Sequence, residues 1–196
     1  VIACDISSCL DDTTGRPTGV VHAAGVDMYS SLSDLVQSHH HTVLAPKTDG
    51  TRNLQHGLVD APVQYAVMFS SASALVGLRS GTMYAAANSC LDAFAQAQRA
   101  AGLPAQSVQW GAVAEIGYAA RHQADMQAEK SGMGAIPRRM AWEALKCTLC
   151  WPTHKVAVLP ADWSQLLRGS GREVPSLLVP RRRPRRRPRR RRVLRR

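Results

Sequence analysis

The sequence is poor in aromatic residues and has no long apolar run. Tyr, Trp and Phe make up 5% of the 196 residues, whereas hydrophobic residues in total reach 45%. This composition favours a Val-, Ala- and Leu-rich α/β domain over an aromatic-rich β protein. No stretch approaches the roughly 18 apolar residues that a membrane-spanning helix needs. The opening VIACDISSC also lacks the basic start and apolar centre of a signal peptide. We therefore expect a cytoplasmic chain without a membrane span, with an organelle left open.

An initiator Met is absent, and Cys is scarce and irregularly placed. The chain opens as if in the middle of a strand, so we expect it to begin inside a larger coding unit. Five scattered Cys argue against a secreted disulfide framework. Cys147 and Cys150 form a CxxC motif, but it lies late in a helical pattern and has no second pair with which to bind zinc. We interpret both as ordinary helix residues, with a redox or metal role as the alternative.

Acidic residues are absent from the last sixteen positions, which hold twelve Arg. Taking these twelve positive charges from the chain's +11 leaves a net charge of −1 for residues 1–180. We expect residues 181–196 to be a disordered tail, joined by a linker at residues 169–180. Such a tail would bind nucleic acid or an anionic surface without sequence preference, or serve as a nuclear-localisation-type address. The alternative is a simple repetitive stretch with no role.

Four short apolar runs predict the strands of a sheet. They are residues 20–24 (VVHAA), 63–71 (VQYAVMFSS), 107–113 (SVQWGAV), which Gly111 interrupts, and 155–159 (KVAVL).

Helical patterns lie between these runs. Strands that alternate with helices predict a Rossmann-like, doubly wound parallel α/β sheet with helices on both faces. Ligands bind such sheets at the carboxyl ends of the strands. The predicted helices are residues 32–58, where Pro46 marks a bend or a new first turn, 81–101, closed by Gly102, and 118–130 and 137–150.

Four polar residues have the chemistry needed to reduce a ketone. Tyr84 and Asn88 are four apart and share a helix face, Ser71 ends a predicted strand, and Lys47 lies upstream. When a hydride reaches a carbonyl carbon, charge grows on the oxygen, and a phenol can donate the proton that quenches it. A nearby ammonium favours the phenolate, a serine hydroxyl can hold the substrate oxygen, and an amide can orient a water or the lysine. The bland alternative is that these residues serve only packing and turns.

The sequences of five segments resemble the ketoreductase domain of polyketide synthases and animal-type fatty acid synthases. These domains belong to the short-chain dehydrogenase/reductase superfamily. The resemblance runs from about residue 1 to residue 163. Its strongest mark is the order Lys, Ser, Tyr, then Asn four residues after Tyr. The segments are HAAGV (22–26), LAPKTDGTRNL (44–54), VMFSSASALVG (67–77), YAAANSCLDAFAQAQRAAGLPAQSVQWG (84–111) and VLPADW (158–163).

The resemblance implies a role for each of these residues. Tyr84 would be the proton donor, Ser71 would position the β-keto oxygen in preference to Ser70 or Ser73, and Lys47 and Asn88 would complete the tetrad. The implied reductant is NADPH. The implied substrate is a β-ketoacyl group on the phosphopantetheine arm of an acyl carrier protein, among other synthase domains. The implied cofactor-binding residues are Asp5, Ala23, Ala24, Gly25, Gly111, Ala112 and Val113, and residues 117–131 would form a lid helix.

The sequence departs from the family pattern at its start. No GxGxxG motif precedes Asp5, although backbone N–H groups of that loop normally bind the cofactor's pyrophosphate. We therefore expect residues 1–168 to be an incomplete ketoreductase region that lacks the first βαβ unit. The alternative functions are a non-catalytic remnant of such a domain and binding of nucleic acid through the tail. The run His39–His41 is interpreted as solvated surface, and no metal site is expected.

Overall fold

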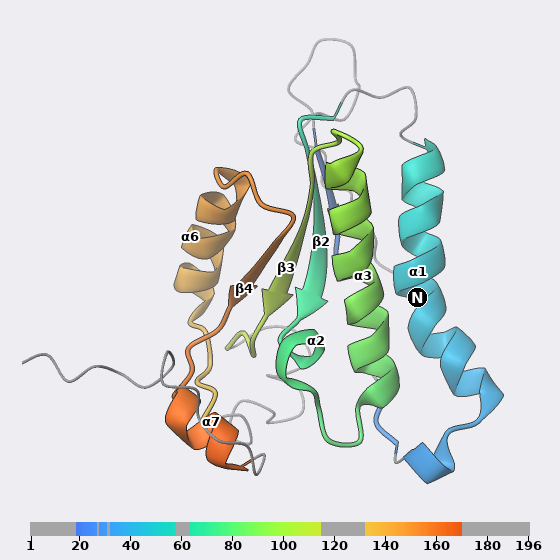
Figure 1. Cartoon of the computed structure of the whole chain (residues 1–196), viewed down its shortest axis with the longest axis vertical. Coiled ribbons are helices and arrows are strands. Elements are labelled where there is room, and N and C mark those ends of the chain that lie inside the picture. Colours follow the sequence, from blue (N-terminus) through green and yellow to red (C-terminus); the bar gives the residue numbers. More distant parts are fainter. Residues whose placement is uncertain (1–18, 27, 31, 58–62, 115–131, 170–196) are drawn as a thin grey trace, which may run out of the picture.

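A four-stranded parallel sheet forms the centre of the molecule (Figure 1). The structure is a computed structural model that describes residues 19–26, 28–30, 32–57, 63–114 and 132–169. All neighbouring strands are parallel and follow the chain order, which confirms the predicted parallel α/β sheet. The strands are β1 (Gly19–His22), β2 (Tyr65–Ser71), β3 (Ala105–Trp110) and β4 (Lys155–Val158).

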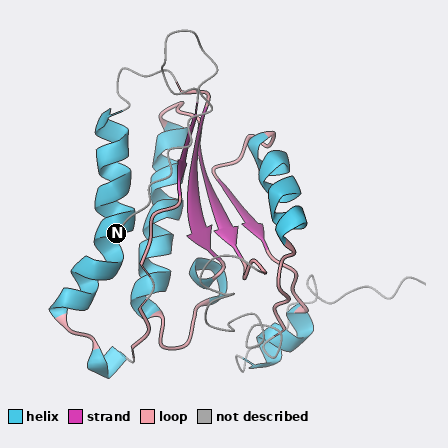
Figure 2. Cartoon of the chain, turned by 180° about the vertical axis from the view of Figure 1, so that it is seen from behind, coloured by secondary structure: helices cyan, strands magenta, loops and turns pink. Residues whose placement is uncertain are grey.

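Helices lie beside the sheet. Helix α3 packs on β2 and β3, α1 packs beside α3, and α6 contacts β4. Seen from behind, the strands lie between α3 and α6 (Figure 2). The helices are η1 (Leu32–Asp34), α1 (Gln37–Gly57), α2 (Ser73–Val76), α3 (Thr82–Ala100), α6 (Arg138–Leu149) and α7 (Trp163–Gly169).

Of the two alternatives predicted for Pro46, a new first turn is wrong, because α1 runs through it as one helix. Pro46 has no N–H to donate within the helix. Threonine hydroxyls bond helix carbonyls nearby: Thr42 Oγ1 donates to Ser38 O (2.9 Å) and Thr48 Oγ1 donates to Leu44 O (2.9 Å).

Helix α3 ends where the sequence predicts. Gly102 has a φ of +81°, a left-handed conformation that glycine adopts at little cost. Its N–H donates to Arg99 O, and the N–H of Leu103 donates to Gln98 O, both at 3.0 Å. This pair of bonds is a Schellman motif, which satisfies carbonyls at a helix end.

Other element boundaries differ from the prediction. Strand β3 begins at Ala105 and ends at Trp110, so Gly111 follows the strand instead of interrupting it. A Cβ at Gly111 would lie 3.0 Å from Leu159 Cβ, which explains a residue without a side chain there.

The pattern did not predict α2, in the Ser-rich turn after β2, or α7, because each is too short to show a helical period. The predicted helix at 118–130 and the opening VIACDI lie outside the described residues.

A buried carboxylate ties α3 to the sheet. Asp92 is 7% exposed and accepts a hydrogen bond from Ser107 Oγ and another from Gln109 Nε2, both at 2.6 Å. These bonds fix α3 above β3, next to an apolar cluster of Met68, Leu91, Ala95 and Ala105.

We expect Asp92→Ala to lower the free energy of unfolding by about 3 kcal/mol, because two buried donors lose their acceptor. Urea denaturation measures this change. Asp49→Ala is the matched control, since Asp49 makes only a surface ion pair with Arg52 at 3.5 Å, and its loss should cost under about 1 kcal/mol. Equal costs for the two variants would contradict the role given to Asp92.

Candidate functional site

The four predicted catalytic residues come from three elements. Lys47 lies on α1, Ser71 is the last residue of β2, and Tyr84 and Asn88 lie in the first two turns of α3. Because β1, β2 and β3 are parallel, their carboxyl ends share one edge of the sheet. The described structure brings the four residues toward this edge.

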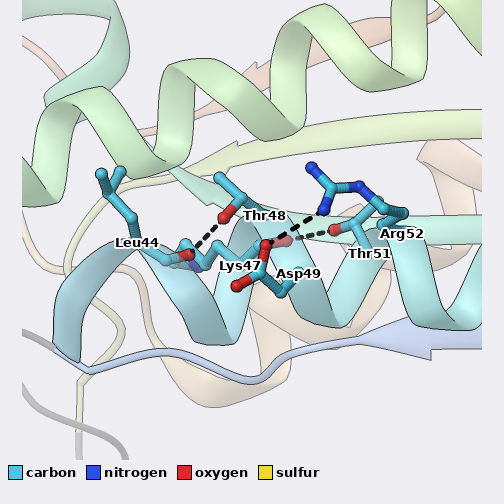
Figure 3. Close-up of polar contacts among 6 residues, drawn as sticks. All are labelled: Leu44, Lys47, Thr48, Asp49, Thr51 and Arg52. Carbon is cyan, nitrogen blue, oxygen red and sulfur yellow. Dashed lines mark hydrogen bonds and ion pairs between the residues drawn. The ribbon is translucent and has the colours of Figure 1, made fainter. Parts of the chain in front are cut away.

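Lys47 is buried, and its ammonium reaches the end of β2. Its Nζ donates to Phe69 O at 2.9 Å, and the residue is 4% exposed. A Cβ at Gly25 would lie 3.0 Å from Lys47 Cε and 3.2 Å from Nζ, so the lysine tip passes beside the segment that follows β1. On α1 around it, Thr51 Oγ1 donates to Lys47 O (Figure 3). The Lys47 ammonium therefore lies at the carbonyl of Phe69, which is two residues before Ser71 in β2.

Asn88 is fully buried and is bonded both within α3 and to β2. Its Nδ2 donates to Tyr84 O at 2.8 Å, and Ser70 Oγ donates to Asn88 O at 3.2 Å. Asn88 Oδ1 is buried and has no hydrogen-bond partner. A buried amide oxygen without a donor is costly, so this atom is suited to accept from an ammonium or an ordered water.

Tyr84 is half-buried and packs against a second aromatic ring. The ring centroids of Tyr29 and Tyr84 are 6.3 Å apart with an interplanar angle of 46°, a tilted geometry typical of favourable aromatic pairs. Ser30 N donates to Ser80 O at 2.8 Å, which joins the segment after β1 to the approach to α3. The sequence analysis did not identify Tyr29, because no spacing in the sequence relates it to Tyr84.

The serine hydroxyls near the end of β2 differ in their hydrogen bonds. Ser70 Oγ donates to Asn88 O, and Ser73 Oγ is buried without a partner. Ser71 is half-buried, and its Oγ accepts from the backbone N–H of Ser73 at 3.1 Å. The Ser71 hydroxyl proton therefore has no part in that bond and can point to a substrate oxygen. This geometry favours Ser71 among the three.

The predicted cofactor-binding residues lie directly after two strands. Ala23 and Gly25 are exposed and Ala24 is 7% exposed beyond the end of β1. After β3, Gly111 N donates to Val158 O at 2.9 Å. The small, exposed residues Ala23 and Gly25 leave the backbone after β1 accessible, whereas the space beside Gly111 is filled by Leu159 and Ile136. Ala112 and Val113 are half-buried next to Ile136, whose N–H donates to Ala112 O at 2.7 Å. The last predicted cofactor-binding residue, Asp5, lies outside the described residues.

His22 is an unexpected buried titratable group at this edge. It is the last residue of β1 and is 3% exposed, and neither ring nitrogen has a hydrogen-bond partner. Burial and then the Lys47 ammonium lower its pKa below the ordinary value of 6.5, while the nearby backbone of Lys47 and Pro46 opposes the shift. The imidazole is therefore neutral at pH 7.

The remaining sequence motifs stand apart from this site. In the described ranges no group of three His, Cys, Asp or Glu side chains could hold a metal ion. Of the histidine run, His40 and His41 are exposed and His39 is half-buried. Cys147 lies in α6 and Cys150 follows its end, both as exposed free thiols. Among the described residues, no helix is both long and apolar enough to cross a membrane. The Arg-rich tail is outside the described residues.

Comparison with known proteins gives consistent matches. A family model described as the KR domain matches residues 3–115. The mycocerosic acid synthase-like polyketide synthase of Mycobacterium tuberculosis (strain ATCC 25618 / H37Rv) is 39% identical over 130 residues, covering 66% of this chain and 6% of the relative. Polyketide synthase GfsA of Streptomyces halstedii is 33% identical over 165 residues, covering 84% of this chain and 2% of the relative. A solved structure of A-type ketoreductases from a modular polyketide synthase has a TM-score of 0.76 and 31% identity, and the match covers 82% of this chain and 34% of that one.

Proposed function

The chain belongs to the KR domain family, the ketoreductase domains of polyketide synthases in the short-chain dehydrogenase/reductase superfamily, and we propose that it carries the catalytic part of such a reductase. The proposed reaction converts a β-ketoacyl thioester to the β-hydroxyacyl form with NADPH. The proposed substrate is borne on the phosphopantetheine arm of an acyl carrier protein, with other synthase domains as partners. The observation that carries the proposal is the bond network that joins Lys47, Asn88 and Tyr84 to the end of β2.

The residues present fit a nicotinamide cofactor at the sheet edge. When bound, NADPH would supply a hydride to the β-carbonyl carbon. The small, exposed residues Ala23 and Gly25 after β1 permit close approach of a ring to the backbone. The sequence holds no GxGxxG motif for the pyrophosphate. Residues 1–168 are thus proposed as the catalytic region, with 169–180 as a linker and 181–196 as a tail.

This chain's own residues would handle the proton and the growing charge. As the carbonyl oxygen gains electrons, Tyr84 donates its phenolic proton to it and becomes a phenolate. The Lys47 ammonium favours that phenolate by its positive charge. The Ser71 hydroxyl donates a hydrogen bond to the same oxygen, and Asn88 Oδ1 accepts from the ammonium or a water. A proton from solvent then restores the phenol.

The test is NADPH oxidation by the purified chain with a β-ketoacyl thioester. The assay is run on the chain alone and with an added N-terminal half of a related ketoreductase that carries the glycine loop. Turnover in either form supports the proposal, and turnover only after addition identifies an incomplete domain with a competent tetrad. If the folded chain neither binds NADPH nor turns over in both forms, the proposal fails and the domain is a non-catalytic remnant.

We expect Gly25→Ala to lower kcat by about tenfold, because the new methyl group displaces the Lys47 ammonium and misplacement of a catalytic group is costly. The lysine tip is flexible, so the free energy of unfolding should change by less than about 0.5 kcal/mol. Gly57→Ala, also a single added methyl group, is the control, since its Cβ would meet nothing within 4 Å. An unchanged kcat in Gly25→Ala would contradict this placement of Lys47.

A further inference from the structure

The ring of His22 occupies a notch in α1. A Cβ at Gly50 would lie 3.2 Å from His22 Cε1 and 3.4 Å from Nε2, and the shorter distance is tighter than most Cβ contacts in proteins. Glycine at this position therefore lets the imidazole lie directly against the helix. Gly57, on the same helix, has no neighbour within 4 Å of its Cβ position, so a notch is not a general feature of α1.

The notch and the catalytic lysine lie on one turn of α1. Lys47 and Gly50 are three residues apart, so their side-chain positions share a face of the helix. His22 contacts this face from the end of β1, while the Lys47 ammonium reaches past Gly25 to Phe69 O. Two contacts thus fix the distance between this turn of α1 and the sheet. The His22 imidazole lies against Gly50, and the Lys47 ammonium bonds Phe69 O.

The surroundings of His22 favour its neutral form. Burial and the Lys47 ammonium both lower its pKa. Asp49 and Arg52 of α1 pair with each other at the surface, and β2 carries no formal charge at pH 7. The buried carboxylate of α3, Asp92, is bonded to β3 side chains.

We propose that His22 is a positioning residue for Lys47, whose uncharged ring in the Gly50 notch fixes the helical turn that presents the ammonium to Tyr84. The role in catalysis rests on the proposed reductase function. It predicts that the positive charge of Lys47 affects the pKa of His22. It also predicts that loss of the His22 ring displaces the Lys47 ammonium without removing it.

The first test needs no cofactor. The imidazole resonance of His22 is identified by NMR as the one absent from His22→Phe and is titrated in the otherwise unchanged chain. We expect a pKa below 6.5 that shifts upward in Lys47→Met, because one of the two causes of the shift is removed. Lys146→Met is the matched control, since Lys146 pairs with Glu143 on α6 and should leave the value unchanged. A His22 pKa that is the same in both lysine variants overturns the proposal.

The second test uses the reductase in whichever form turns over. We expect His22→Ala to lower kcat by about tenfold with little change in KM for the thioester, and to move the basic limb of the pH–rate profile upward, because the displaced ammonium no longer favours the Tyr84 phenolate. His22→Phe keeps a ring in the notch and should restore most of the kcat. A fall in melting temperature with an unmoved pH profile would show a merely structural role and refute the proposal. If no form of the wild-type chain turns over, the reductase function fails, whereas the NMR result still decides the contact.

Discussion

Replacing Tyr84 by Phe is expected to lower the rate of ketone reduction by about 10³-fold, within the range attributed to general acid catalysis. That factor corresponds to about 4 kcal/mol of transition-state stabilisation. The substitution removes only the phenolic O–H. The ring can keep its contact with Tyr29, and the bond from Asn88 Nδ2 goes to the backbone oxygen of Tyr84. NADPH binding and the melting temperature should therefore stay close to those of the wild-type chain.

Single-turnover NADPH oxidation, with the cofactor affinity measured separately by fluorescence, separates chemistry from binding. Tyr65→Phe is the matched control, because Tyr65 begins β2 at the end of the strand opposite Ser71. We expect that variant to keep wild-type rates. A Tyr84→Phe enzyme with more than about a tenth of the wild-type rate would assign the proton donor to another group.

The sequence alone predicts the sheet and the elements that bear the site. Parallel strands follow from short apolar runs separated by helices. Ser71 is indeed the last residue of β2, and Tyr84 and Asn88 lie one turn apart on α3. These features depend on local patterns, which a single sequence displays directly.

The supports of the site could not be predicted in the same way. Lys47 bonds a backbone carbonyl, that of Phe69, and every residue carries such an acceptor, so no side-chain pattern marks it. The contact between His22 and Gly50 depends on how closely α1 packs against β1, which is a tertiary property. Pro46 leaves a bend or a new first turn open as local alternatives, and only the structure shows that α1 continues through it. Long-range packing therefore determines what local propensity leaves open.

The charge of Lys47 can be separated from most of its volume by Lys47→Met, whose unbranched side chain is one heavy atom shorter and uncharged. We expect kcat to fall by about 10²-fold, since the phenolate that forms at Tyr84 loses its nearby positive charge. We expect the Tyr84 phenol to ionise less readily without that charge. The phenol then stays protonated to higher pH, so the basic limb of the pH–rate profile moves upward.

In contrast to its activity, the stability of Lys47→Met should be unchanged or higher than that of the wild-type chain. A buried ammonium has a desolvation cost that methionine lacks, so we expect the free energy of unfolding of Lys47→Met to be equal to or above that of the wild-type chain. Lys146→Met, which breaks the 2.9 Å surface pair with Glu143, should alter neither kcat nor the pH profile. If Lys47→Met loses activity only in proportion to lost folded protein, Lys47 is a packing residue. If activity falls in a fully folded enzyme and the basic limb shifts upward, its charge acts on the proton that Tyr84 donates.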